Sequence, residues 1–150
     1  MPKKLTKEEL DLLEKSGYSE KAIEYYANRV NVGIIENADA ALAYTGPCGD
    51  TIKLYLKVDA NGTIEDAKFQ YLGCPGSASS GSALTRLVKG KTLEEAKRFT
   101  EHDIFKELGG LPESKLHCPK LVVATLQKTF SKRLKGKLMK QFQGMRGLII

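Results

Sequence analysis

The stretch that decides the fold is residues 51–58, TIKLYLKV, in which apolar and polar side chains alternate. Successive side chains of a strand point to opposite faces, so one face of this segment is wholly aliphatic and the other is mostly polar. The aliphatic face consists of Ile52, Leu54, Leu56 and Val58. The pattern predicts a strand with one face in the core and the other toward solvent.

Two further strands are predicted, one before and one after this segment. The sequence DANG at 59–62 is typical of a turn and leads into a strand near 63–72, while 41–45 fit a strand before the turn GPCGD. Consecutive strands joined by short turns form an antiparallel meander. Its apolar face needs a helical cover, so the predicted fold class is α+β: a three-stranded antiparallel sheet covered by helices.

Helix signals stand before the strands. Thr6 and Glu9 have the spacing of a capping box, which predicts a helix from residue 7 to Gly17. Ser19 is suited to cap a second helix that ends near the sequence NRVNVGI. Residues 1–17 are therefore interpreted as an N-terminal helical extension.

Helix signals also follow the strands. The small-residue stretch GSASSGSALTRLVKG predicts a helix that lies close to the sheet, and shorter helices are expected from Thr92 and near 101–108. Pro119 suits the first position of a last, longer helix. The apolar stripe of that helix consists of Val122, Leu126, Phe130 and Leu134.

Composition limits the function classes. The chain has 150 residues, 41% hydrophobic and 28% charged, which indicates one globular domain. The net charge of +6 arises largely near the C-terminus, where few aromatic residues interleave with the basic ones, so a docking surface for an acidic partner is favoured over nucleic-acid binding. No stretch is apolar enough to cross a bilayer and no signal core is visible, so a cytoplasmic location without a membrane partner is expected.

The three cysteines all stand in turn-like stretches: Cys48 in GPCGD, Cys74 in LGCPG and Cys118 in LHCPK. Because antiparallel strands reverse direction, the turn after the first strand and the exit of the third strand lie at the same end of the sheet. The N-terminus of the last helix can bring Cys118 to that end. The sequence therefore predicts a metal site at one end of the sheet.

Two further residues could bind metal beside the cysteines. Asp50 is two residues from Cys48, so in an extended strand both side chains point to one side, and His117 precedes Cys118. The helix N-terminus is expected to favour the thiolate of Cys118. Other readings stay open from the residues alone, because the cysteine spacings match no zinc-finger or ferredoxin pattern. Each cysteine could be a buried small hydrophobe, Asp50 a turn residue and His117 a helix cap.

Four segments, YSEKAIEYYANRVNVG, PCGDTIKLYLKV, LGC and LPESKLHC, resemble the iron–sulfur scaffold proteins of the IscU and NifU N-terminal family. The resemblance runs from about Tyr18 to Lys132, with the three cysteine contexts in the family's order. It implies a scaffold domain at 18–135, preceded by the 1–17 extension and followed by a basic tail at 136–150.

The resemblance also implies a function: a scaffold, not an enzyme, on which iron and sulfur from a cysteine desulfurase form a [2Fe–2S] cluster that passes to apo-proteins. Cys48, Cys74 and Cys118 would be cluster ligands and sulfur acceptors, and Asp50 or His117 the fourth ligand. The family also binds zinc at this site, and a homodimer is compatible with it. The loop LPESK departs from the family's LPPVK at Glu113 and Ser114, which puts recognition by a chaperone in question.

Two rival functions are considered. A zinc-bound acceptor of persulfide sulfur would use the same residues, but such relatives carry a longer insertion between the second and third cysteines. A thiol hydrolase would need Cys48 or Cys74 as nucleophile and His117 as base. The second rival is more remote, because no substrate pocket is indicated and the adjacent side chains of His117 and Cys118 are expected to diverge.

Overall fold

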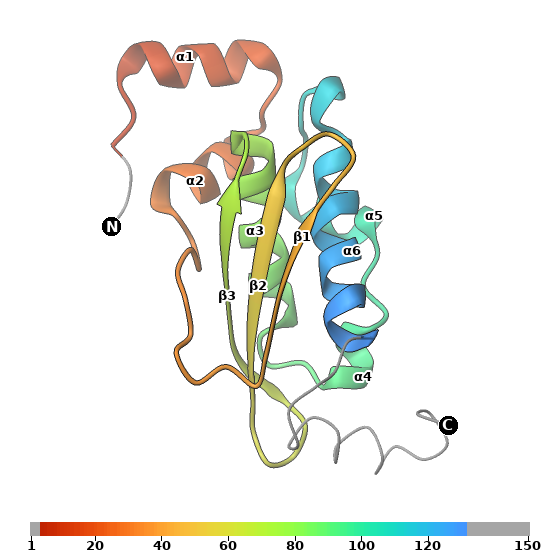
Figure 1. Cartoon of the computed structure of the whole chain (residues 1–150). Coiled ribbons are helices and arrows are strands. Elements are labelled where there is room, and N and C mark those ends of the chain that lie inside the picture. Colours follow the sequence, from red (N-terminus) through yellow and green to blue (C-terminus); the bar gives the residue numbers. More distant parts are fainter. Residues whose placement is uncertain (1–3, 132–150) are drawn as a thin grey trace.

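The computed structural model describes residues 4–131 and contains one three-stranded sheet with helices on one of its faces (Figure 1). The predicted leucine at 134 and the tail at 136–150 lie outside the described residues. In chain order the elements are α1 (Lys7–Ser16), α2 (Glu20–Asn28), β1 (Ala40–Thr45), β2 (Thr51–Val58), β3 (Ile64–Leu72), α3 (Pro75–Val88), α4 (Leu93–Ala96), α5 (Glu101–Leu108), a 3-10 turn (Glu113–Lys115) and α6 (His117–Ser131).

The sheet has the predicted order β1-β2-β3, with both pairs antiparallel and β2 in the centre. Leu54 of β2 lies opposite Leu42 of β1 and Phe69 of β3. The aliphatic face of β2 is buried as expected, because each of its four side chains is at most 1% exposed: Ile52, Leu54, Leu56 and Val58. The α+β prediction is therefore confirmed.

Helix α3 packs directly on this buried face and also contacts α2, α5 and α6. Its small residues make this close approach possible, since a Cβ added at Gly81 would lie only 2.3 Å from Cε2 of Phe69. Cys74 caps α3 and Pro75 is its first residue. The sheet and the start of α3 are therefore held in one rigid relationship.

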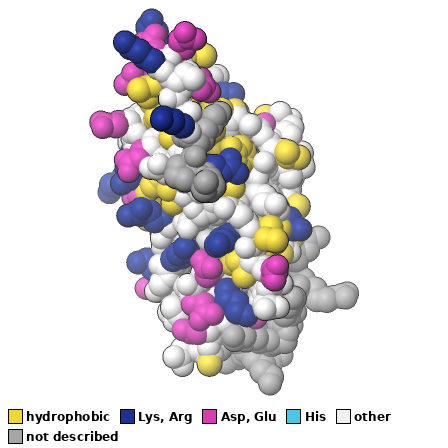
Figure 2. Space-filling view, turned by 90° about the vertical axis from the view of Figure 1, so that its left-hand side faces the viewer, with side chains coloured by type: hydrophobic (Ala, Val, Ile, Leu, Met, Phe, Trp, Pro, Cys, Tyr) yellow, Lys and Arg dark blue, Asp and Glu magenta, His cyan; other side chains and the backbone are white. Residues whose placement is uncertain are grey.

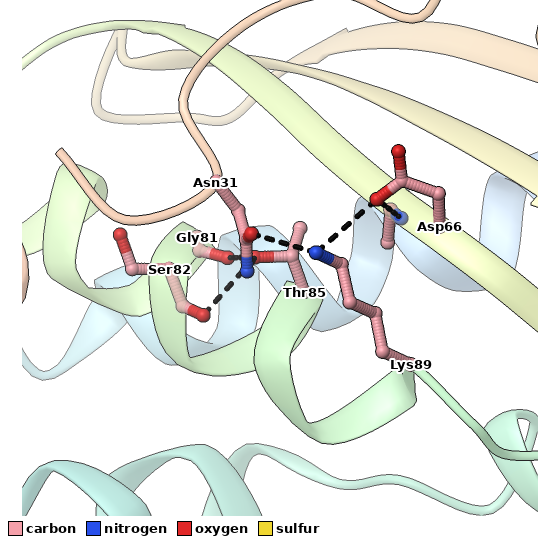
Figure 3. Close-up of polar contacts among 7 residues, drawn as sticks. Asn31, Asp66, Gly81, Ser82, Thr85 and Lys89 are labelled. Atoms are coloured by element: carbon pink, nitrogen blue, oxygen red, sulfur yellow. Dashed lines mark hydrogen bonds and ion pairs between the residues drawn. The ribbon is translucent and has the colours of Figure 1, made fainter. Parts of the chain in front are cut away.

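The segment that follows α2 closes the outer edge of β3 (Figure 3). Phe69 N–H donates to the Asn31 carbonyl at 3.0 Å, and Gly33 N–H donates to the Phe69 carbonyl at 2.8 Å. Asn31 has a positive φ of 60°, and its side chain donates to Thr85 and accepts from Lys89. Residues 31–33 are thereby fastened to both β3 and α3.

The N-terminal and C-terminal helices differ in how far the sequence predicted them. The capping box of Thr6 and Glu9 is present and α1 ends at Gly17, as predicted, although α1 has no buried residue. The start of α6 was wrong, because the helix begins at His117, two residues before Pro119. No helix among residues 4–131 is long and apolar enough to span a membrane.

Candidate metal centre at one end of the sheet

Three connections meet at the end of the sheet where β1 and β3 finish (Figure 1). The β1–β2 turn carries Cys48 and Asp50, Cys74 stands between β3 and α3, and α6 begins with His117 and Cys118. The strands place the first two connections at this end because they are antiparallel. Helix α6 packs on β1 and β2 and brings its first turn to the same place.

All five predicted residues are brought together in two overlapping groups. Donor atoms of Cys48, Asp50 and His117 lie within 4.8 Å of one another, as do those of Asp50, Cys74 and Cys118. The sulfur of Cys74 is 3.6 Å from Oδ2 of Asp50 and 3.9 Å from the sulfur of Cys118. Cys48 is exposed, Cys74 is half-buried and Cys118 is buried, so the cluster extends from the surface inward.

The side chains of His117 and Cys118 do not diverge. Nε2 of His117 lies 3.7 Å from the sulfur of Cys118. The long imidazole reaches back over the first turn of α6, whereas the shorter cysteine side chain is buried beside it. The expectation that these two neighbours serve separate sites was therefore wrong.

The thiolate of this group belongs to Cys74 and not, as predicted, to Cys118. A hydrogen bond from the Cys118 thiol lowers the pKa of Cys74 to about 5, and the N–H of Ser77 and the charge of Lys115 act in the same direction. The same contact with Cys74, together with burial, raises the pKa of Cys118. The helix N-terminus at Cys118 is thus outweighed by its burial beside another sulfur.

Asp50 is fixed as a carboxylate by groups from α3. The hydroxyl of Ser77 donates to Oδ2 of Asp50 at 2.5 Å, and this bond, followed by weaker ones from Cys74, lowers the pKa of Asp50. Gly73 leaves the room for this carboxylate, because a Cβ there would lie 2.6 Å from Cγ of Asp50. The carboxylate is therefore held in the plane of the thiols with its charge intact.

Three residues near the donors were missed as site residues. Ser77 contacts Asp50 and both inner cysteines, and its place in the first turn of α3, three residues after Cys74, was the available signal. Tyr18 hydrogen-bonds with Cys74, and burial, followed by the nearby thiolates, raises the pKa of its phenol. Lys115 carries a positive charge toward Cys74. Only folding brings Tyr18 and Lys115 to the site.

The donor set suits soft and borderline metals. Thiolate sulfur and imidazole nitrogen are preferred by zinc and by iron–sulfur clusters, whereas calcium and magnesium prefer sites built from oxygen. Asp50 adds one harder oxygen to three sulfurs. The residues therefore fit iron in a cluster, and they also fit zinc.

Comparison with known proteins agrees with this site. The family of the NifU-like N-terminal domain matches residues 17–139. "Iron-sulfur cluster assembly scaffold protein IscU 1" of Archaeoglobus fulgidus is 42% identical over 112 residues, 74% of this chain and 72% of that protein. "Iron-sulfur cluster assembly enzyme IscU" of Drosophila melanogaster is 45% identical over 109 residues, 69% of this chain and 70% of that protein.

One solved structure supports the fold assignment. The crystal structure of a putative iron–sulfur cluster assembly scaffold protein for the SUF system, from Fervidobacterium islandicum, superposes with a TM-score of 0.61 at 26% identity. The match covers 75% of this chain and 95% of that chain. From its sequence match, its sheet and its three convergent cysteines, the chain belongs to the family of the NifU-like N-terminal domain.

Proposed function

We propose that this protein is a scaffold on which [2Fe–2S] clusters are assembled and from which they are passed to apo-proteins. The observation that carries the proposal is the convergence of three thiols, from three separate connections, on one carboxylate and one imidazole. The names of the relatives, scaffold and assembly proteins for iron–sulfur clusters, support it. The cluster is cargo, so the protein acts as a carrier and not as an enzyme.

In this proposal the three cysteines hold the iron and accept sulfur. A cysteine desulfurase offers a persulfide, and a scaffold thiolate attacks its outer sulfur. The new S–S bond forms as the desulfurase thiolate leaves. The Cys74 thiolate is poised for this attack, and the exposed Cys48 is accessible to a partner. Reduction of the transferred sulfur to sulfide requires electrons from an external donor.

Asp50 and His117 are the proposed candidates for the fourth ligand. A cluster held by thiolates alone is held firmly, whereas a carboxylate oxygen is a weaker ligand for iron in a cluster. Asp50 would therefore ease release of the cluster to a client protein that offers a complete set of cysteines. Hand-off through a chaperone is not part of the proposal, because the loop at 111–115 reads LPESK. We place the protein in the cytoplasm, where thiols stay reduced.

The test is anaerobic reconstitution of the full chain with ferrous iron, cysteine and a desulfurase. The expected product has broad visible absorption and about two irons per site, and Cys118→Ser abolishes both. Asp50→Asn should prolong the life of the cluster under a chelator. Asp66→Asn, at the far end of the sheet, is the matched control and should leave it unchanged.

Two outcomes would replace the proposal. If no chromophore forms while stoichiometric zinc persists and the protein takes up persulfide sulfur, the zinc-bound sulfur acceptor is correct. If hydrolysis of thioesters depends on Cys48 and His117 without any metal, the chain is a thiol enzyme. Either result is read from the same preparations by absorption, metal analysis and mass spectrometry.

A further inference from the structure

The two edges of the sheet are finished differently. The outer edge of β3 is closed at Phe69 by residues 31–33, and charged side chains of both signs interrupt the apolar ones on that side of the molecule (Figure 2). Strand β1 pairs only with β2 among residues 4–131, so its outer edge is free there. An open edge is a template for another strand unless charges, proline or a bulge protect it.

The free edge of β1 offers a regular row of backbone groups. The bond from Gly46 N–H to the Asp50 carbonyl sets the alternation, so Ala40, Leu42 and Tyr44 bond to β2. The N–H and C=O groups of the intervening residues therefore point away from the sheet: Ala41, Ala43 and Thr45. The sequence of the strand, AALAYT, contains no charge and no proline. This edge thus lacks the usual protection against pairing.

A groove runs beside this edge, between the end of β1 and α6. It has a volume of about 540 Å³, and its walls include Tyr44, Pro47, Cys48, His117, Leu121 and Ala124. Most of these side chains are apolar, and the groove reaches the exposed thiol of Cys48. A strand added to β1 would place alternate side chains in this groove.

The charge around the edge selects the occupant. Lys120 also lines the groove, and the ammonium of Lys128 lies 4.8 Å from the centre of the Tyr44 ring. Neither β1 nor α6 contains an acidic residue. A second copy would bring the same lysines together, and the sequence at 132–150 is itself basic without any acid. Like charges oppose both of these occupants, whereas an acidic segment is attracted.

We propose that the edge of β1 and its groove bind an extended segment of a partner protein in which apolar residues alternate with aspartate or glutamate. The segment adds a fourth strand through Ala41, Ala43 and Thr45, places its apolar side chains in the groove and pairs its carboxylates with Lys120 and Lys128. Its end then lies beside Cys48. This inference goes beyond the proposed function and stands without it, because it rests on the edge and the groove and not on a metal.

The test uses the metal-free full chain and two synthetic peptides of about eight residues. In one, valine alternates with glutamate, and in the other with lysine. The glutamate peptide should bind at least about tenfold more tightly by fluorescence anisotropy, and it should slow amide hydrogen exchange at Ala41, Ala43 and Thr45. Equal binding of the two peptides, or protection that leaves these three amides unchanged, would overturn the proposal.

Variants separate pairing from charge. Ala43→Pro removes one outward N–H at an edge position that tolerates proline, and it should weaken the glutamate peptide about tenfold, whereas Ala43→Thr should not. Lys128→Glu should shift the preference toward the lysine peptide, while Lys106→Glu, on α5, should leave it unchanged. Circular dichroism confirms that each variant is folded. If Lys106→Glu had the same effect as Lys128→Glu, only net charge would matter and the groove assignment would be wrong.

The other occupants give distinct results without any peptide. A second copy would make protection of the three amides increase with protein concentration. The basic tail would make protection concentration-independent and would lose it when residues 136–150 are removed. Either pattern overturns the proposal, and neither outcome depends on whether the protein assembles a cluster.

Discussion

The two ends of the sheet are built from the same three strands but are completed in different ways. At the far end, backbone groups bond one another: Ile64 N–H donates to Lys91 at 2.8 Å and Leu93 N–H donates to Gly62 at 3.0 Å. At the metal end the thiols make only long sulfur contacts, such as the 3.9 Å between Cys74 and Cys118. One end is complete in itself, and the other gathers donor atoms that an external ion completes.

Zinc addition is expected to show the largest difference between the ends. Because the folded chain gathers the donors and the unfolded chain does not, excess zinc should raise the free energy of unfolding by about 4 kcal/mol at about a thousandfold above Kd. Urea unfolding with and without zinc measures it. Cys118→Ser should lose most of the gain. An equal gain in this variant would mean that zinc binds elsewhere.

Gly81→Ala is expected to damage the core and spare the metal end. The new methyl group would overlap the Phe69 ring, where the calculated separation is 2.3 Å, so the fold should lose about 3 kcal/mol. Urea unfolding of the metal-free protein gives the loss, and a competition titration should give an unchanged zinc affinity. Adding Phe69→Leu should restore part of the stability. If zinc affinity fell in parallel with stability, the two regions would not be separable.

Gly73→Ala is the matched change at the metal end. Its methyl group would lie 2.6 Å from Cγ of Asp50 and displace the carboxylate, so zinc affinity should fall about tenfold, which is ~1.4 kcal/mol. The stability of the metal-free protein should change by less than about 1 kcal/mol, since the site contacts are weak. The same competition titration and urea unfolding decide it. A stability loss as large as that of Gly81→Ala would contradict the contrast.

The smallest predicted effect concerns pH. Because the pKa of Cys74 is lowered to about 5, its thiolate persists above that pH and is protonated only as the pH falls through it. In the metal-free Cys48→Ser variant, alkylation of Cys74 should therefore fall only by about half between pH 7 and pH 5. An ordinary thiol would lose about a hundredfold over that range. Mass spectrometry of the alkylated peptide distinguishes the two.

The sequence predicted the parts that depend on local pattern. The alternation in 51–58 and the capping boxes of α1 and α4 were sufficient for the strands and short helices. The meander alone placed Cys48 and Cys74 at one end. Convergence of the five donors followed from the order of the elements, and the structure has it.

The rest depends on packing between distant segments. The bridge between Val32 and Phe69 leaves no periodic signal, so closure of the β3 edge was not predicted. The hydroxyl of Ser77 reaches Asp50 only because α3 packs tightly on the sheet. The location of the thiolate was wrong, since the burial of Cys118 beside Cys74 is not visible in sequence.

The distribution of the donors along the chain also orders events during synthesis. Cys48, Asp50 and Cys74 emerge from the ribosome well before His117 and Cys118, which open the last described helix. Until α6 has formed, the nascent chain offers one carboxylate and two thiols with no buried third sulfur. Metal capture is thereby delayed until the protein is nearly finished. A chain interrupted before α6 has no complete site, so truncated products do not compete with the finished protein for iron.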